Sequence, residues 1–313
     1  MKNTHQRVLV NCLIPYPRKD LPPSMAPHGP VPDFHRLYSH PTRLQRLTNG
    51  LLSLNLNALR LLLRNGPSAA RDFVTQSYRL YSGFGMPHPW ERLSWWRNRD
   101  VPAKAVEELF PEIDFTRSAE LLFPMPRDLG ISTQELNILC KVVGHFQPKK
   151  VVEFGTAEGR TTVNIANQLP HDGEIITLDF PPVPGQNEVG YFYWQQPAKS
   201  KIKQVFCGVD SWDSRPHLAS TDIVFCDACD LMPGMAAEVF QAFSAIKPGG
   251  VIFRHDYGSV VGVTLFWNWL ATQLPIFNIQ GTTLLCLRLD LAAYAKAQTL
   301  LSLPLLKDSV VSV

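Results

Sequence analysis

A glycine-containing turn with an acidic residue is the first feature of this chain that could do chemistry. The apolar run 151–154 contains Glu153, and Gly155, Thr156 and Gly159 follow before a helical pattern begins. A strand, a tight turn and a helix start in this order form the ligand-binding turn of doubly wound α/β folds. The spacing differs from the G-x-G-x-x-G of dinucleotide sites and from a phosphate-binding loop. A carboxylate at Glu153 would repel a pyrophosphate, so the turn favours a ligand with ammonium and sulfonium groups.

Polar residues also follow the next two predicted strands. Asp179 lies 26 residues after Glu153, which is one strand–helix–strand unit further along the chain. An acid at this place in such folds accepts hydrogen bonds from ribose hydroxyls. Asp210 and Ser211 follow the third predicted strand, where an adenine would bind. These positions predict a nucleoside-bearing ligand.

A second group of titratable residues follows the fourth and fifth predicted strands. Asp227 directly follows the run 222–226, and His255 and Asp256 directly follow the run 251–254. Two routes to activating a hydroxyl stay open. Asp227 and Asp256 could hold a divalent metal such as Mg²⁺, which acidifies a bound hydroxyl. Alternatively, His255 could act as the general base.

The elements that position these residues follow from apolar periodicity. Ser132 and Glu135 form a capping box before a helix that reaches position 146. After this helix, apolar runs alternate with helical patterns, which predicts a parallel sheet. Strands are expected at 151–154, 175–178, 202–206, 222–226, 251–254, 276–279 and 283–289, and the last two form a hairpin. The predicted fold class is α/β, a doubly wound, Rossmann-like, seven-stranded sheet, mostly parallel with one antiparallel strand, plus an N-terminal helical extension.

We expect three parts along the chain. Residues 1–41 contain eight prolines and predict a proline-rich arm. Residues 42–131 predict a helical region that caps the main domain, covers its substrate or joins two copies in a homo-oligomer. The catalytic domain is expected at 132–313.

Composition excludes several classes of protein. The net charge is +3 with scattered basic residues, so no nucleic-acid partner is expected. The most apolar helical stretch, 51–63, is too short for a membrane span. Six dispersed cysteines predict a reducing, cytoplasmic location, and Cys226 and Cys229 are expected to be core residues rather than a redox or zinc pair.

Taken together, these motifs resemble those of class I S-adenosylmethionine-dependent methyltransferases, particularly bacterial members that methylate small-molecule or glycan hydroxyls. The resemblance covers about residues 118–290 and includes the turn at 153–162, Asp179, the segment 247–250 and the segment 281–283. One departure is Asp230, which stands where the family usually has a histidine.

The resemblance implies roles for individual residues. Glu153, Gly155 and Gly159 would surround the methionine part of S-adenosylmethionine, Asp179 would bind the ribose, and Asp210 and Ser211 would lie near the adenine. Thr156 and Asp227 are further candidates for binding this methyl donor. The predicted activity is O-methylation of a small-molecule or glycan hydroxyl. A non-catalytic methyltransferase-like scaffold and, less favoured, an NAD-dependent oxidoreductase are the alternatives.

Overall fold

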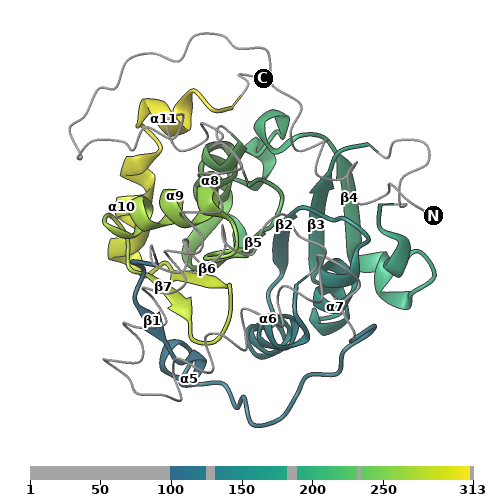
Figure 1. Ribbon diagram of the computed structural model, residues 1–313. Coiled ribbons are helices and arrows are strands. Elements are labelled where there is room, and N and C mark those ends of the chain that lie inside the picture. The colour runs from purple at the N-terminus through teal and green to yellow at the C-terminus, as the bar shows by residue number, and fades with distance from the viewer. Residues whose placement is uncertain (1–98, 125–130, 182–188, 231–233, 311–313) are drawn as a thin grey trace, which may run out of the picture.

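The computed structural model describes residues 99–124, 131–181, 189–230 and 234–310. A sheet of eight strands runs through it, with helices on both faces (Figure 1). The strands are β1 (Ala103–Lys104), β2 (Lys150–Phe154), β3 (Glu174–Asp179), β4 (Ile202–Phe206), β5 (Thr221–Cys226), β6 (Ile246–Arg254), β7 (Ile276–Ile279) and β8 (Leu285–Arg288). Their order across the sheet is β1-β7-β8-β6-β5-β2-β3-β4.

The pairing confirms the predicted fold class. All neighbouring strands are parallel except β8, which is antiparallel to both β6 and β7. The hairpin predicted from its short connection is therefore β7–β8. The eighth strand, β1, was not predicted. It adds two residues to the sheet edge beside β7, and two residues are too few to show an alternating pattern in the sequence.

Helices and short 3₁₀ turns connect the strands. The α-helices are α5 (Val106–Leu109), α6 (Thr133–Phe146), α7 (Arg160–Gln168), α8 (Gly234–Ala245), α9 (Val261–Ala271), α10 (Leu291–Leu300) and α11 (Pro304–Lys307). The 3₁₀ turns cover Tyr191–Tyr193, Pro197–Lys201, Val209–Ser211 and Arg215–His217. The sequence predicted α6 to α9, but not α10 or α11, which pack beyond the last strand.

Alternate residues of the central strands enter two separate cores. Val151, Ile175 and Phe253 belong to the core that includes α6 and α7. Val152 and Ile252 belong to the core on the opposite face, which includes α8, α9 and α10. Because side chains alternate across a strand, a sheet covered on both faces needs continuous apolar runs. This is why the central strands were recognisable in the sequence.

One element boundary differs from the prediction. The helix α6 reaches Phe146, as expected, and closes through Gln147, whose φ is 46°. The strand β6, however, begins at Ile246 and includes the segment 247–250, ahead of the strand expected at 251–254. Ile246 pairs with Thr221 in β5 before the register shifts, and pairing between distant residues leaves no local pattern in the sequence.

Several predictions concern residues outside the described ranges. The proline-rich arm at 1–41, most of the helical region at 42–131 and the apolar stretch at 51–63 lie there. Among the helices of the described ranges, none combines the length and the apolar character that a membrane span requires.

Candidate active site at the carboxyl edge of the sheet

The turn between β2 and α7 is held by close backbone contacts. The N–H groups of Gly155 and Thr156 both donate to the carbonyl oxygen of Leu178 in β3, at 2.9 and 3.1 Å. Gly155 has a φ of 95°, and a Cβ atom there would lie 2.6 Å from the carbonyl oxygen of Asp227. Only glycine fits, since any side chain would collide with the backbone that follows β5. This contact also shows that Asp227 lies directly beside the turn.

Gly159 is required by a different neighbour. It precedes α7 with a φ of 81°, and a Cβ atom there would lie 2.6 Å from the ring of Tyr193. The Tyr193 hydroxyl donates to the side-chain oxygen of Gln204 at 2.5 Å. The turn is therefore closed on its outer side by the Tyr191–Tyr193 segment.

Glu153 lies fully buried under the turn, on the face covered by α7. Its Oε2 accepts hydrogen bonds from the hydroxyls of Thr162 and Thr177 at 2.5 and 2.6 Å. Its Oε1 is buried and has no hydrogen-bond partner among the described residues. Burial raises the pKa of Glu153 to about 8, despite the two hydroxyl hydrogen bonds that stabilise its charged form. Burial thus favours the neutral form of Glu153 unless a positive charge lies close to it.

The three residues expected beside the nucleoside lie at the end of β3 or shortly after β4, which are neighbouring strands. The Asp179 carboxylate ends β3 and accepts hydrogen bonds from the N–H groups of Ala157 and Phe180, both at 2.7 Å. Burial raises the pKa of Asp179. Asp210 and Ser211 follow β4, the neighbour of β3, and the Ser211 hydroxyl donates to the carbonyl oxygen of Gly208 at 3.0 Å. The structure brings these residues to the edge that the sequence predicted.

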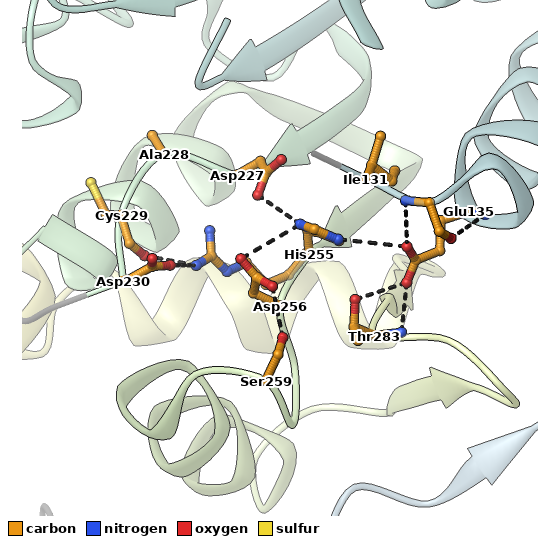
Figure 2. Close-up of polar contacts among 12 residues, drawn as sticks. Ile131, Glu135, Asp227, Ala228, Cys229, Asp230, His255, Asp256, Ser259 and Thr283 are labelled. Atoms are coloured by element: carbon orange, nitrogen blue, oxygen red, sulfur yellow. Dashed lines mark hydrogen bonds and ion pairs between the residues drawn. The ribbon is translucent and has the colours of Figure 1, made fainter. Parts of the chain in front are cut away.

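Asp227, His255 and Asp256 come together at the ends of β5 and β6 (Figure 2). The N–H of Asp227 donates to the Phe154 carbonyl oxygen at 2.9 Å, and that of His255 to the Cys226 carbonyl oxygen at 3.1 Å. These bonds continue the parallel pairing past the strand ends. The His255 Nδ1 lies 3.0 Å from Asp227 Oδ1 and 3.6 Å from Asp256 Oδ2. One ligand atom from each of the three residues lies within 4.8 Å of the others.

The Asp256 backbone holds its carboxylate in this cluster. Its φ is 65°, a left-handed conformation that aspartate adopts more easily than most residues. The Ser259 hydroxyl donates to Asp256 Oδ1 at 2.7 Å, and the N–H of Val260 donates to the Asp256 carbonyl oxygen at 3.2 Å. The other carboxylate oxygen, Oδ2, is the one that faces His255.

The charges around His255 determine its protonation. Burial by itself lowers the pKa of His255, but the carboxylates of Asp227 and Asp256 outweigh burial and raise it well above its ordinary value. His255 is 5% exposed. The same two carboxylates lie on the Nδ1 side of the ring, at 3.0 and 3.6 Å.

Glu135 is a site residue that the sequence analysis did not identify. It was recognised only as part of a capping box, and both capping hydrogen bonds are present in α6. Its Oε2 also lies 3.6 Å from His255 Nε2, on the side of the ring opposite Asp227 (Figure 2). A carboxylate 120 residues earlier in the chain gives no local signal that it reaches His255.

A buried ion pair supports the segment that follows Asp227. Arg254 is fully buried, and its Nη1 donates to Glu238 Oε2 at 3.0 Å. Glu238 Oε1 in turn accepts hydrogen bonds from the N–H groups of Ala228 and Cys229, at 2.8 and 3.1 Å. Asp230, which stands in the place of the expected histidine, lies 3.1 Å from Arg254 Nη2. The pair thereby fixes the backbone next to Asp227.

Cys226 and Cys229 were expected to be core residues. Cys226 is buried in β5, and Cys229 is half-buried beside Gly234. The described residues contain no disulfide at this position.

Comparison with known proteins identifies part of the chain. Residues 152–257 match a family model described as a methyltransferase domain. A catechol O-methyltransferase from Mycobacterium tuberculosis is 31% identical over 106 residues, which cover 33% of this chain and 46% of that protein. The chain thus matches less than half the length of this curated relative.

Solved methyltransferase structures are also similar. The O-methyltransferase TomG from Streptomyces achromogenes, in complex with S-adenosylmethionine, has 20% identity and a TM-score of 0.40, covering 59% of this chain and 96% of its own. The Podospora anserina methyltransferase PaMTH1 has 14% identity and a TM-score of 0.41, covering 66% and 98%. At these low scores the structures carry no conclusion about function.

The match to the methyltransferase-domain model is limited to residues 152–257. It confirms the predicted resemblance to S-adenosylmethionine-dependent methyltransferases for this segment.

Proposed function

We propose that the protein is an S-adenosylmethionine-dependent methyltransferase that methylates a hydroxyl of a small molecule or glycan. The observation that carries the proposal is the contact between Gly155 and Asp227. A Cβ atom at Gly155 would lie 2.6 Å from the Asp227 carbonyl oxygen, so the expected donor turn adjoins the acidic cluster. Methyl transfer needs this proximity, because the attacking oxygen must be aligned with the methyl carbon. The curated relative, a catechol O-methyltransferase, supports oxygen as the acceptor atom.

The environment of Glu153 fits the methyl donor. Its buried, unpartnered Oε1 is an acceptor that a ligand ammonium group would satisfy. A nearby positive charge would also lower the pKa of Glu153 and favour its ionised form. We propose that the residues of the donor site are Glu153, Gly155, Thr156, Gly159, Asp179, Asp210, Ser211 and Asp227.

The acidic cluster fits a divalent metal. Asp227 and Asp256 supply oxygen ligands, which suit Mg²⁺, and the nitrogen of His255 extends the choice to Mn²⁺. A bound metal would supply Lewis acidity that lowers the pKa of a hydroxyl. The chain's own contribution is to hold two carboxylates and one imidazole close together beside the donor turn. Metal binding at His255 requires that the coordinating ring nitrogen carry no proton.

The decisive experiment has two stages. Calorimetry on the full-length protein should detect binding of S-adenosylmethionine and S-adenosylhomocysteine but not of NAD. Absence of binding by both sulfur nucleosides would refute the proposal, and NAD binding would favour the oxidoreductase alternative. Binding of the nucleosides without transfer to any hydroxyl in an acceptor panel would favour a non-catalytic scaffold.

The metal is tested separately with Asp227→Ala. We expect this change to lower kcat by about 10²–10⁴-fold, the range for losing a group that promotes proton removal. Treatment with EDTA should have a similar effect, and added Mg²⁺ or Mn²⁺ should reverse it. The matched control is Asp172→Ala, whose exposed carboxylate pairs with Lys149 at the surface. Activity unchanged by EDTA and by Asp227→Ala would exclude the metal.

The remaining predictions concern the parts of the chain that flank the matched segment. We propose that 1–41 is a proline-rich arm, that 42–131 is a helical cap or oligomerisation region, and that 132–313 is the methyltransferase domain. A cytoplasmic location and the absence of a nucleic-acid partner also remain predictions. Light scattering of the full chain and of a form lacking 1–98 would test the role of the N-terminal region in oligomerisation.

A further inference from the structure

Glu135 joins three segments that are distant in the sequence. It lies in the first turn of α6, is 4% exposed and belongs to no part of the matched segment 152–257. Its Oε1 accepts two hydrogen bonds from Thr283, from the N–H at 2.7 Å and from the hydroxyl at 2.8 Å. Its Oε2 accepts one from the N–H of Ser132 at 3.0 Å and faces His255 Nε2 at 3.6 Å. Figure 2 shows His255 between this carboxylate and the two aspartates.

Counting the donors around Glu135 indicates where His255 carries a proton. A carboxylate only accepts hydrogen bonds and has about four acceptor sites on its two oxygens. Thr283 and Ser132 supply three donors to Glu135. Glu135 also lies within electrostatic reach of Arg99. The next ring nitrogen is His255 Nε2, and a lone pair there would face a carboxylate in a buried environment. The arrangement is favourable only if Nε2 carries hydrogen.

The other ring nitrogen faces the opposite way. His255 Nδ1 lies 3.0 Å from Asp227 and 3.6 Å from Asp256, within the group of donor atoms that could hold a metal. The partner of one imidazole nitrogen determines what the other can do.

We infer that Glu135 is a positioning residue, which keeps the proton on His255 Nε2 and presents Nδ1 to the Asp227–Asp256 side of the cluster. This inference deepens the proposed function, since it names the ring nitrogen that would bind the metal and the residue that orients the ring. Glutamine cannot replace Glu135, because its amide NH₂ group is a donor and would face another donor in either orientation. In one orientation it would face the Thr283 N–H, and in the other it would face the Ser132 N–H and His255.

The direct test is the protonation of the His255 ring in the full-length protein labelled with ¹⁵N-histidine. The chain has nine histidines, and the signals of His255 are identified by their loss in His255→Asn. Long-range ¹H–¹⁵N correlation should show a slowly exchanging proton on Nε2 in the wild type. That proton should exchange rapidly in Glu135→Gln. An unprotonated Nε2 in the wild type overturns the inference, whether or not the variant folds.

Ser132→Ala is the matched control for damage to α6. It removes the hydrogen bond from Glu135 N to Ser132 Oγ but keeps the Ser132 N–H that contacts the Glu135 carboxylate. The loss of such a cap weakens the start of the helix without touching His255. The Nε2 proton should therefore persist in Ser132→Ala. Equal effects of Ser132→Ala and Glu135→Gln would show that Glu135 acts only through helix stability and would overturn the inference.

Metal affinity gives a second readout that needs no catalysis. Titration with Mn²⁺, followed by the electron paramagnetic resonance of the free ion, should show affinity reduced about 10–100-fold in Glu135→Gln, as for other partners of metal-bound histidines. Unchanged affinity in Glu135→Gln would contradict the inference. If the wild type does not bind Mn²⁺, the proposed metal site fails while the ring-nitrogen spectrum still decides the role of Glu135. Methyl-donor calorimetry tests the proposed function independently of both.

Discussion

The buried carboxyl group of Glu153 destabilises the protein as the pH rises. The side chain is fully buried, and its Oε1 has no partner among the described residues. Glu153→Gln should therefore stabilise the protein without added methyl donor. The glutamine oxygen can accept the hydrogen bonds that Thr162 and Thr177 now donate to Oε2, and its amide nitrogen replaces the unpartnered oxygen. The change removes the charge and conserves the shape of the side chain.

The magnitude follows from the pKa of Glu153, which burial raises from an ordinary value of 4.5 to about 8. Between these values the unfolded chain has released the proton and the folded protein still holds it. Folding must then take up a proton, so the stability contributed by this group falls as the pH rises. At about 1.4 kcal/mol per pKa unit, the penalty is roughly 3 kcal/mol at pH 7 and vanishes below about pH 4.5.

Urea unfolding of both proteins at several pH values measures this effect. The difference in unfolding free energy between Glu153→Gln and the wild type should be small at pH 4.5 and reach about 3 kcal/mol in favour of the variant at pH 7. Comparing the two proteins cancels the titration of all other groups. A difference that stays constant with pH would refute the reasoning, as would a variant that is less stable at pH 7.

Glu238→Gln is the control, because it makes the same chemical change at another buried glutamate. Glu238 is 1% exposed but is paired with Arg254 and accepts two backbone N–H bonds. Burial raises the pKa of Glu238 too, to about 7. We expect the loss of the partner of a buried guanidinium to outweigh this, so the variant should be less stable than the wild type. If Glu153→Gln raises the free energy of unfolding and Glu238→Gln lowers it, the effect at Glu153 comes from its unpaired carboxyl group and not from burial alone.

Two further variants test the backbone contact and the buried ion pair. Gly155→Ala should reduce S-adenosylhomocysteine affinity at least 100-fold in calorimetry, an order-of-magnitude expectation from a collision with the Asp227 backbone and a strained φ. Gly249 has a similar positive φ but open space around it, so Gly249→Ala should bind S-adenosylhomocysteine normally. Equal losses of affinity in the two variants would mean that backbone strain alone is responsible. Arg254→Met should lower the free energy of unfolding by about 3–5 kcal/mol, and a second change, Glu238→Gln, should recover part of the loss. A cost below about 1 kcal/mol would contradict the importance of the pair.

The sequence was sufficient to predict most of the sheet and the glycine-containing turn after β2. The runs that became β2, β5 and β6 are apolar on both faces, since helices cover both sides of the sheet. Gly155 and Gly159 were recognised by spacing, and the structure adds the atoms that exclude a side chain at each position. Parallel strands bring their carboxyl ends to one edge, so Asp227 and His255 could be expected to converge.

The short or peripheral elements were not predictable in the same way. The strand β1 has two residues and is stabilised only by its pairing with β7. The helices α10 and α11 follow the last strand and pack on the core that includes α8. Both helices have a start signal, an N-cap at Asp290 and a proline at Pro304, that the sequence analysis did not use.

The sequence by itself determined which residue types stand at the strand ends, and from these came the prediction that a methyl donor and an acidic cluster share one edge of the sheet. Tertiary structure decided how charge is distributed there. It buried Glu153 and raised the pKa of its carboxyl group, and it enclosed His255 between Asp227 and Glu135. Both effects depend on burial and on partners far away in the chain. The turn at Gly155 could thus be predicted from local spacing, whereas the role of Glu135 became visible only when the fold placed it 3.6 Å from an imidazole nitrogen.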